Sequence, residues 1–173
     1  MNRNVEIKAK VTDLDALRGR AEKLANEGPA VLEQEDTFFV CPRGRLKLRR
    51  FERGREAELI YYERPDSAEP KESHYLVHRT SDPDSLRQAL GAALGIRGVV
   101  RKRRTLYLVG STRVHLDKVE GLGEFVELEV VLKPEESVSD GVTVARDLMA
   151  RLGIADAELI TGAYMDLLER TDV

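Results

Sequence analysis

The sequence has little of several features that often guide interpretation: it has one cysteine, Cys41, no tryptophan, and only 5% aromatic residues. A single cysteine cannot form an internal disulfide bond, and the cysteine spacing of a metal site is missing, so we expect a protein of the reducing cytoplasm. No apolar run approaches the ~18 residues of a membrane-spanning helix, and the charged N-terminus does not resemble a signal segment. We therefore expect no membrane partner.

An excess of charge of one sign is also missing. The 28 Lys and Arg residues nearly balance the 31 Asp and Glu residues, which argues against a nucleic-acid partner. Charged residues nevertheless make up 34% of the chain, well above the typical proportion of about a quarter. The 173 residues suffice to bury a sizeable core, and we expect one domain over 1–173.

The chain opens with a strand pattern, NVEIKAKV. Val5 and Ile7 alternate with Glu6 and Lys8, so one face is apolar and the other is charged. Comparable patterns predict seven further strands, over residues 36–40, 45–51, 57–64, 73–79, 99–109, 112–119 and 124–132. Helical spacing predicts four helices, within residues 12–28, 82–95, 139–154 and 158–170. In the first helix, Thr12 is the expected N-cap and Gly28 the expected C-terminal stop.

The predicted elements repeat, because each half of the chain reads as a strand, a helix and then three strands. Eight strands with few helices favour an α+β fold in which an antiparallel sheet closes into a barrel, with the helices packed outside. Since helices need an apolar sheet face to pack on, the charged strand faces would turn inward and line a charged tunnel. For any single strand, a solvated charged face is the simpler interpretation.

Acidic residues on these charged faces form a candidate metal site. Glu127 and Glu129 lie two residues apart on one strand, so they point the same way, roughly 7 Å apart. Glu6 and Asp117 can join them from other strands. Like charges repel unless something neutralises them, and a cluster of carboxylates suits Mg²⁺ or Mn²⁺. Cross-strand ion pairs with Lys and Arg are the alternative interpretation.

Basic residues on the same faces outnumber the acids: Lys8, Lys47, Arg49, Lys102, Arg104 and Arg113. Arginine forks grip phosphate oxygens and lysines supply point charges, so bases beside a metal ion indicate a site for a polyanionic phosphate ester. His115 shares a charged face, where a role in the site and an ordinary surface position are both open. The run RKRR, residues 101–104, alternates between two faces, which argues against a flat surface for nucleic acid.

Three stretches in the right order resemble the CYTH superfamily, also called the triphosphate tunnel metalloenzymes. The family's E-x-E-x-K strand is matched by VEIKAKV, its second-half signature by RKRRTLYLVGSTRVHLDKVEGLGEFVELEVVL, and its C-terminal helix by AYMDLLE. The likeness spans essentially the whole chain and is greatest to the class IV adenylyl cyclase-like branch. It implies an eight-stranded antiparallel tunnel with a charged interior.

The resemblance also implies roles for individual residues. It places Mg²⁺ or Mn²⁺ on Glu6, Glu127 and Glu129, with Asp117 assisting. It implies that catalysis depends on Glu6, Lys8, Glu127 and Glu129. It assigns triphosphate binding to the bases Lys8, Arg49, Lys102, Arg104 and Arg113. We add Lys47, which shares the face of Arg49, and Arg64, which can replace a basic residue of the family pattern.

The sequence departs from the family pattern at two positions. The leading Glu of the hallmark strand is Asn4 here, which offers a carbonyl oxygen in place of a carboxylate. An expected Lys is Tyr62, and Arg64 or Lys71 is the expected substitute for its charge. Both departures affect the predicted grip on the metal and the phosphates.

Three functions follow from the resemblance. An adenylyl cyclase-like enzyme, which converts ATP to cyclic AMP and pyrophosphate, agrees best with the overall likeness. A triphosphatase acting on tripolyphosphate, thiamine triphosphate or a nucleoside triphosphate uses the same phosphate-binding residues, and no adenine pocket is identifiable from the sequence. A non-catalytic binder of polyphosphate or nucleotide is the third, supported by Asn4. The cyclase-like branch also suggests a homodimer.

Overall fold

The computed structural model describes residues 1–52 and 56–171. Its eight strands are β1 (Asn2–Lys10), β2 (Glu27–Phe39), β3 (Arg45–Phe51), β4 (Ala57–Glu63), β5 (Lys71–Thr80), β6 (Ile96–Val109), β7 (Thr112–Val119) and β8 (Gly123–Leu132). Its α-helices are α1 (Leu14–Leu24), α2 (Pro83–Leu94), α3 (Val138–Leu152) and α4 (Tyr164–Thr171), and a short 3₁₀ helix spans Asp156–Glu158.

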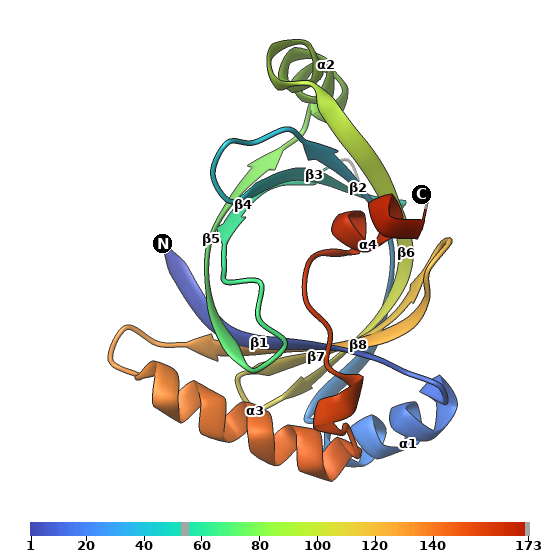
Figure 1. Ribbon diagram of the computed structural model, residues 1–173, viewed down its shortest axis with the longest axis vertical. Coiled ribbons are helices and arrows are strands. Elements are labelled where there is room, and N and C mark those ends of the chain that lie inside the picture. Colours follow the sequence, from blue (N-terminus) through green and yellow to red (C-terminus); the bar gives the residue numbers. More distant parts are fainter. Residues whose placement is uncertain (53–55, 172–173) are drawn as a thin grey trace.

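The eight strands form one closed antiparallel barrel in the order β1-β5-β4-β3-β2-β6-β7-β8 (Figure 1). Strand β1 closes the ring, because it pairs with β5 on one side and with β8 on the other. The predicted eight-stranded antiparallel tunnel with a charged interior is confirmed. Alternation along each strand then gives every residue either an inward or an outward side chain.

The ring also has the predicted internal repeat. Strands β1 and β5 each precede a helix, and each helix precedes three strands. The pairing follows the same symmetry, since β4 pairs with β5 as β8 pairs with β1, and β2 pairs with β6 across the junction of the halves. The two halves therefore supply equivalent walls of one tunnel.

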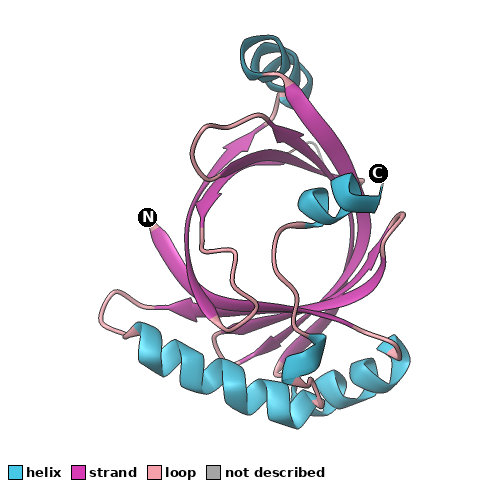
Figure 2. Ribbon diagram, viewed as in Figure 1, coloured by secondary structure: helices cyan, strands magenta, loops and turns pink. Residues whose placement is uncertain are grey.

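Helices α1 and α3 lie outside the ring on one side and α2 lies on the opposite side (Figure 2), and there they cover apolar outward faces of the strands. Ile7 and Leu128 on the strands are buried against Leu17 of α1 and Leu148 of α3. Burying each such side chain contributes about 2 kcal/mol, so the charged faces are left to the inside of the ring. Helix α3 lies very close to β1, since a Cβ added at Gly141 would come within 2.6 Å of a Val5 methyl group.

Helix α2 covers the opposite side of the barrel, where Leu86 and Leu90 pack on a cluster that contains buried Leu48. As predicted, Asp82 caps this helix, accepting a hydrogen bond from the Ser85 backbone N–H at 3.2 Å, and Pro83 occupies its first turn. None of the helices within the described ranges is long and apolar enough to cross a membrane.

Three predictions about the first helix and the second strand are wrong. The N-cap is Asp13, whose carboxylate accepts from the Ala16 backbone N–H at 2.9 Å, and the helix ends at Leu24. Gly28, the expected helix stop, lies inside β2 with a φ of 109°. Strand β2 begins nine residues before the predicted start at Asp36. These nine residues have no continuous apolar face, but their pairing with β6 holds them as a strand.

The last predicted helix, over residues 158–170, is also wrong in its first half. The α-helix begins only at Tyr164, and residues 159–163 before it are not helical. The Ile160 backbone N–H donates to the Lys8 carbonyl at 2.9 Å, and Leu159 forms a bridge with Ala9. These contacts with β1 replace helical hydrogen bonds and lead the chain across one end of the tunnel (Figure 1).

Candidate active site

The inside of the barrel contains a cavity of about 340 Å³ lined by charged side chains. Seven lining residues are Lys or Arg, and five are Asp or Glu. Every base predicted to bind the triphosphate lines it: Lys8, Lys47, Arg49, Arg64, Lys102, Arg104 and Arg113. Three of the four predicted metal ligands also line it: Glu6, Glu127 and Glu129. The excess of positive charge favours a polyanionic ligand.

The acidic wall of the cavity is built by the register of β1, β7 and β8. Glu127 lies opposite Lys8 on one side and His115 on the other. Glu129 lies two residues further along β8, opposite Glu6 and Arg113. The hairpin of β7 and β8 and the distant strand β1 therefore bring three acids, two bases and a histidine to one patch of the wall.

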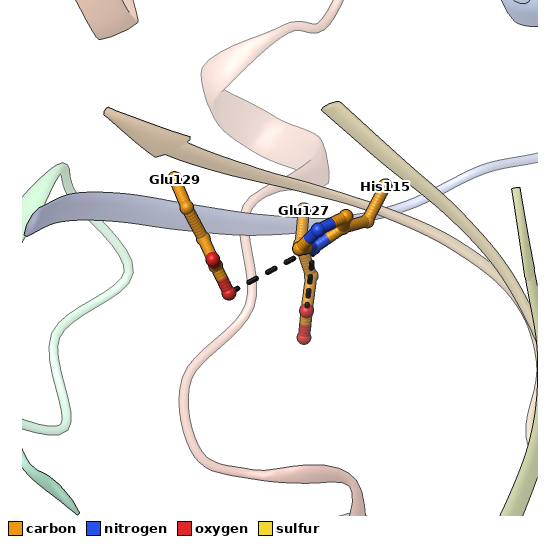
Figure 3. Close-up of side chains that lie close together, drawn as sticks. All are labelled: His115, Glu127 and Glu129. Carbon is orange, nitrogen blue, oxygen red and sulfur yellow. Dashed lines mark ion pairs between the residues drawn. The ribbon is translucent and has the colours of Figure 1, made fainter. Parts of the chain in front are cut away.

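His115, Glu127 and Glu129 form the tightest group of potential metal ligands in the described residues (Figure 3). The His115 Nδ1 lies 3.8 Å from a Glu127 oxygen and 3.7 Å from a Glu129 oxygen. One ligand atom from each residue lies within 4.8 Å of the others. Among the described residues Nδ1 has no hydrogen-bond partner, although it is buried. An imidazole nitrogen and two carboxylate oxygens at these separations fit a divalent ion.

The charge states of this group follow from its surroundings. Burial lowers the pKa of His115, and the Arg104 cation lowers it further, so the imidazole is neutral near pH 7 and can offer a lone pair. Burial alone would raise the pKa of Glu127, but the Lys8 and Arg104 cations hold it well below its usual range. The site therefore combines a neutral nitrogen ligand with an ionised carboxylate.

Glu6 differs from Glu127 in the direction of its pKa shift. Burial raises the pKa of Glu6, although its ion pair with Arg64 opposes that shift. The negative charges of Glu129 and Glu127 raise it further. A divalent cation in this wall would lower all three pKa values, because it favours the ionised form of each carboxylate.

Asp117, the fourth predicted metal ligand, lies behind the cavity wall and is fully buried. Its two oxygens accept from Arg104 at 2.7 and 2.6 Å, and one of them also accepts from the Tyr164 hydroxyl at 2.8 Å. A carboxylate with these partners fixes the Arg104 fork. The other guanidinium contact of Arg104 is a 2.6 Å hydrogen bond to Glu127, so Asp117 reaches the metal-ligand group through Arg104.

Asp36 is a buried acid of the site that the sequence interpretation missed. It accepts from Lys47 at 3.0 Å and from two nitrogens of Arg49 at 2.8 Å each, and Lys102 Nζ lies 3.7 Å away. Burial would raise its pKa, but Arg49 and Lys47 lower it well below the usual range. Asp36 thus holds three bases of β3 and β6 in place. The sequence did contain a signal for it: Asp36 and Phe38 lie two residues apart on one strand, so their side chains point to the same face.

The segment leading into α4 contributes two further groups that the sequence did not reveal. The Gly162 carbonyl accepts from Lys8 Nζ at 3.2 Å and from Arg64 at 2.9 Å. The Lys8 ammonium lies 3.8 Å from the centre of the Tyr164 ring, a cation–π contact. Tyr164 also packs with Phe125 in an apolar cluster that fills this end of the barrel.

The two departures from the family pattern both face the cavity. Asn4 is buried there, and its Oδ1 has no hydrogen-bond partner among the described residues. Tyr62 lines the wall, and Arg64 reaches Glu6 as the charge expected near that position. Lys71 pairs in register with Glu6 but does not line the cavity, and burial lowers its pKa to about 8.

The run RKRR divides between the two faces of β6 as its alternation predicted. Lys102 and Arg104 are buried inside, whereas Arg101 and Arg103 are exposed outside and pair with acids of β2. The buried bases therefore serve the cavity, and the exposed ones form surface ion pairs.

This combination of a closed eight-stranded tunnel, inward bases and an acidic patch matches a known family. Residues 2–164 match the model of the CYTH domain. The chain belongs to the CYTH family. The fold, the lining charges and the family match cover the same residues.

Individual relatives agree with the CYTH assignment. Adenylate cyclase CyaB of Aeromonas hydrophila is 28% identical over 179 residues, which cover 96% of this chain and 89% of that protein. The PH1012 protein of Pyrococcus horikoshii OT3 has a TM-score of 0.86 at 25% identity, covering 95% of this chain and 99% of that one. HpAC1 of Hippeastrum, described as having a dominant triphosphatase activity, has a TM-score of 0.64 at 15% identity, covering 99% and 96%; this likeness shows the fold alone.

Proposed function

We propose that this CYTH protein is a divalent-metal-dependent enzyme of the adenylyl cyclase type, which converts ATP to cyclic AMP and pyrophosphate. The observation that carries the proposal is the cavity itself, where the group His115, Glu127 and Glu129 lies beside a lining rich in Lys and Arg. The similarity to adenylate cyclase CyaB over 96% of this chain supports the choice of reaction.

The acidic wall is the proposed metal site. His115, Glu127 and Glu129 would hold the ion, with Glu6 next to them, and the ion would supply Lewis acidity toward a phosphate oxygen. Mn²⁺ is the preferred ion in this proposal, because imidazole nitrogen suits Mn²⁺ better than the strongly oxygen-seeking Mg²⁺.

The bases are the proposed triphosphate site. Arg49 and Arg104 are held in fixed orientations by the buried carboxylates of Asp36 and Asp117, so their forks are preorganised. Lys8 lies 3.1 Å from a Glu127 oxygen and adds a point charge next to the metal-ligand group. These groups balance the charge of the triphosphate and of the departing pyrophosphate.

In the proposed reaction, the ribose 3′-oxygen forms a bond to the α-phosphorus and the 3′-hydroxyl proton passes to solvent water. The bond from the α-phosphorus to the bridging oxygen breaks, and pyrophosphate leaves with the electron pair. The chain's contribution is to position the triphosphate in line with the attacking oxygen and to stabilise the charge that develops on the leaving group.

Triphosphatase activity is the second candidate. The Lys and Arg side chains that line the cavity can contact phosphate oxygens, and none of these contacts selects which phosphorus reacts. Water attacking the terminal phosphorus would use the same bases and the same acidic wall. The two reactions differ in the position of the attacking oxygen.

Product analysis tests the proposal. Purified protein is incubated with ATP or with tripolyphosphate, each with Mg²⁺ or Mn²⁺, and the products are resolved by ion-exchange chromatography. Cyclic AMP with an equal amount of pyrophosphate is the expected result with ATP. Orthophosphate with ADP, or with pyrophosphate from tripolyphosphate, would favour the triphosphatase. Tight binding of both substrates without turnover would contradict both enzyme candidates and leave a binding protein.

A further inference from the structure

An apolar patch lines the cavity at the end away from α4. Its members are Leu32, Gln34, Phe51 and Leu106, which lie on the neighbouring strands β2, β3 and β6. Phe38 packs in the cluster beside α4, and Leu32 lies six residues earlier on the same strand, roughly 20 Å away. The patch is therefore separate from the apolar cluster that fills the other end.

The patch begins where the buried bases end. In the barrel register Gln34 lies opposite Lys102 on one side and Phe51 on the other, while Leu32 lies opposite Arg104. Leu106 follows Arg104 by two positions, so both side chains point inward, about 7 Å apart along the strand. A ligand whose phosphates contact these bases would place its next group on the patch.

An inorganic polyphosphate has no part that benefits from such a surface. Half-buried leucine and phenylalanine side chains gain free energy only when an apolar or aromatic group covers them. The flat ring of a nucleobase covers this kind of patch well, and aromatic stacking on a base is tolerant of small changes in position.

Gln34 provides a polar group within the patch. Its side chain is only 6% exposed, and its Oε1 has no hydrogen-bond partner in the part of the chain that the structure describes. A buried acceptor without a partner costs free energy, which a ligand donor can recover. The amide carries a donor and an acceptor on one plane, and rotation of its last torsion presents either one to the cavity.

We propose that this patch is a nucleobase site that selects a 6-aminopurine. The base packs on Phe51, Leu32 and Leu106, while Gln34 accepts from the exocyclic amino group and donates to N7 on the same edge of the purine. Guanine presents two acceptors on that edge, O6 and N7, so the Gln34 oxygen would stay unpaired in either orientation of the amide. The inference rests on the proposed triphosphate site and deepens it, because it places the base of the proposed substrate in one part of the cavity and assigns its selection to Gln34.

The test compares the binding of ATP, GTP and tripolyphosphate by isothermal titration in EDTA, so that no divalent ion supports turnover. Wild-type protein should bind ATP about tenfold more tightly than GTP. Gln34→Leu should remove that difference and leave the tripolyphosphate Kd unchanged. Thermal unfolding of Gln34→Leu checks the fold, which should keep its stability because an unpaired buried polar group is lost.

A second pair of variants tests the apolar part. Leu32→Ala should weaken ATP binding about fivefold and spare tripolyphosphate, since only the base contacts the side chain. Val31→Ala is the matched control, because Val31 is the next residue of β2, points outward and is 51% exposed. It should leave all three affinities unchanged.

The outcomes separate this inference from the enzyme proposal. Equal affinity for ATP and GTP, or a Gln34→Leu effect of the same size on all three ligands, would overturn the nucleobase site while the triphosphate proposal stands. Binding and hydrolysis of tripolyphosphate without binding of ATP would overturn both the nucleobase site and the cyclase reaction, and would leave the triphosphatase. If none of the three ligands binds, either in EDTA or with Mn²⁺, the triphosphate proposal fails, and the nucleobase site fails with it.

Discussion

Strands β4 and β8 occupy equivalent places in the two halves of the barrel, yet their inward side chains differ. On β8 the cavity is lined by Glu127 and Glu129, and on β4 by Glu58, Ile60 and Tyr62. Figure 1 shows β8 and β1 on one side of the ring, with β3 and β4 across from them. The two halves repeat the same arrangement of strands, but the inward side chains of equivalent strands differ in charge and polarity.

This difference gives the tunnel two unlike walls. The wall of β1, β7 and β8 brings carboxylates and His115 together, whereas β3 contributes Lys47 and Arg49 to the opposite side. A strictly symmetric barrel would spread acids and bases evenly, and its ion pairs would neutralise one another. A metal ion with a triphosphate needs both kinds of wall within one cavity.

The largest expected effect comes from breaking the acidic wall. Glu127→Gln keeps the shape of the side chain and removes its charge, so metal-dependent turnover should fall about a hundredfold. The measurement is kcat with saturating Mn²⁺. Glu124→Gln on the outer face of the same strand, where Glu124 pairs with Lys118 at the surface, is the control and should retain activity. Equal activity of the two variants would contradict a catalytic role for the acidic wall.

The next effect concerns stability. Asp117→Asn should lower the free energy of unfolding by about 3 kcal/mol, because Arg104 loses its buried carboxylate partner. Glu129→Gln should cost only about 1 kcal/mol, since the Glu129 and Arg113 side chains are partly exposed. Urea denaturation without metal compares the two variants. A large loss of Mn²⁺ affinity in Asp117→Asn would instead support Asp117 as a direct ligand.

The third prediction concerns the choice of metal ion, where His115 should contribute about a factor of ten to the Mn²⁺ affinity. His115→Asn should weaken Mn²⁺ binding by that factor and Mg²⁺ binding by less, because only the nitrogen ligand is lost. Electron spin echo spectroscopy of bound Mn²⁺ should show ¹⁴N coupling in the wild type and none in the variant. His78→Asn, at an exposed position of β5, is the control. Bound Mn²⁺ without nitrogen coupling in the wild type would exclude His115 as a ligand.

The smallest effect should be a dependence of triphosphate affinity on pH, which comes from the cavity lysines Lys47 and Lys102. Burial and the neighbouring Arg49 lower the pKa of Lys47 to about 8, although Asp36 opposes this shift. Lys47 is protonated below that pH and loses its charge above it, so triphosphate binding should weaken about threefold between about pH 7 and about pH 9. Lys102, which also faces Asp36, has a pKa of about 7 and adds to the slope.

Titration calorimetry at several pH values measures the effect of Lys47. In Lys47→Arg the side chain keeps its positive charge at every pH tested, so the share of the pH dependence of triphosphate affinity that comes from Lys47 should disappear. An equally steep profile in the variant would assign the dependence to other groups.

The sequence predicted those parts of the fold in which each strand has two chemically distinct faces. Strand β3 was predicted at its observed limits, and the parity of its residues placed Lys47 and Arg49 together inside. Strand β2 was predicted too short because its outward residues before Asp36 are largely exposed and polar, which weakens the alternation. Asp36 was missed for that reason, although its place in the alternation already put its side chain on the inward face of the strand.

The C-terminal part of the site depends on contacts that no local pattern encodes. Residues 158–163 carry helical spacing, but Ile160 bonds to β1 and Gly162 adopts a φ of 82°, which favours glycine. The carbonyl that Lys8 and Arg64 share exists only because the chain returns across the tunnel. The His115 group is likewise a product of register, since its members lie on two strands joined by a hairpin.

The closed ring also limits how this protein can meet other chains. An open sheet has edge strands whose free N–H and C=O groups can pair with a peptide or with a second copy, whereas each strand here has a neighbour on both sides. Extension of the sheet by another chain is therefore blocked wherever a strand pairs on both sides. The strand ends differ, since residues 76–80 of β5 pair with β4 alone, so an added strand would lie at the rim and leave the tunnel closed.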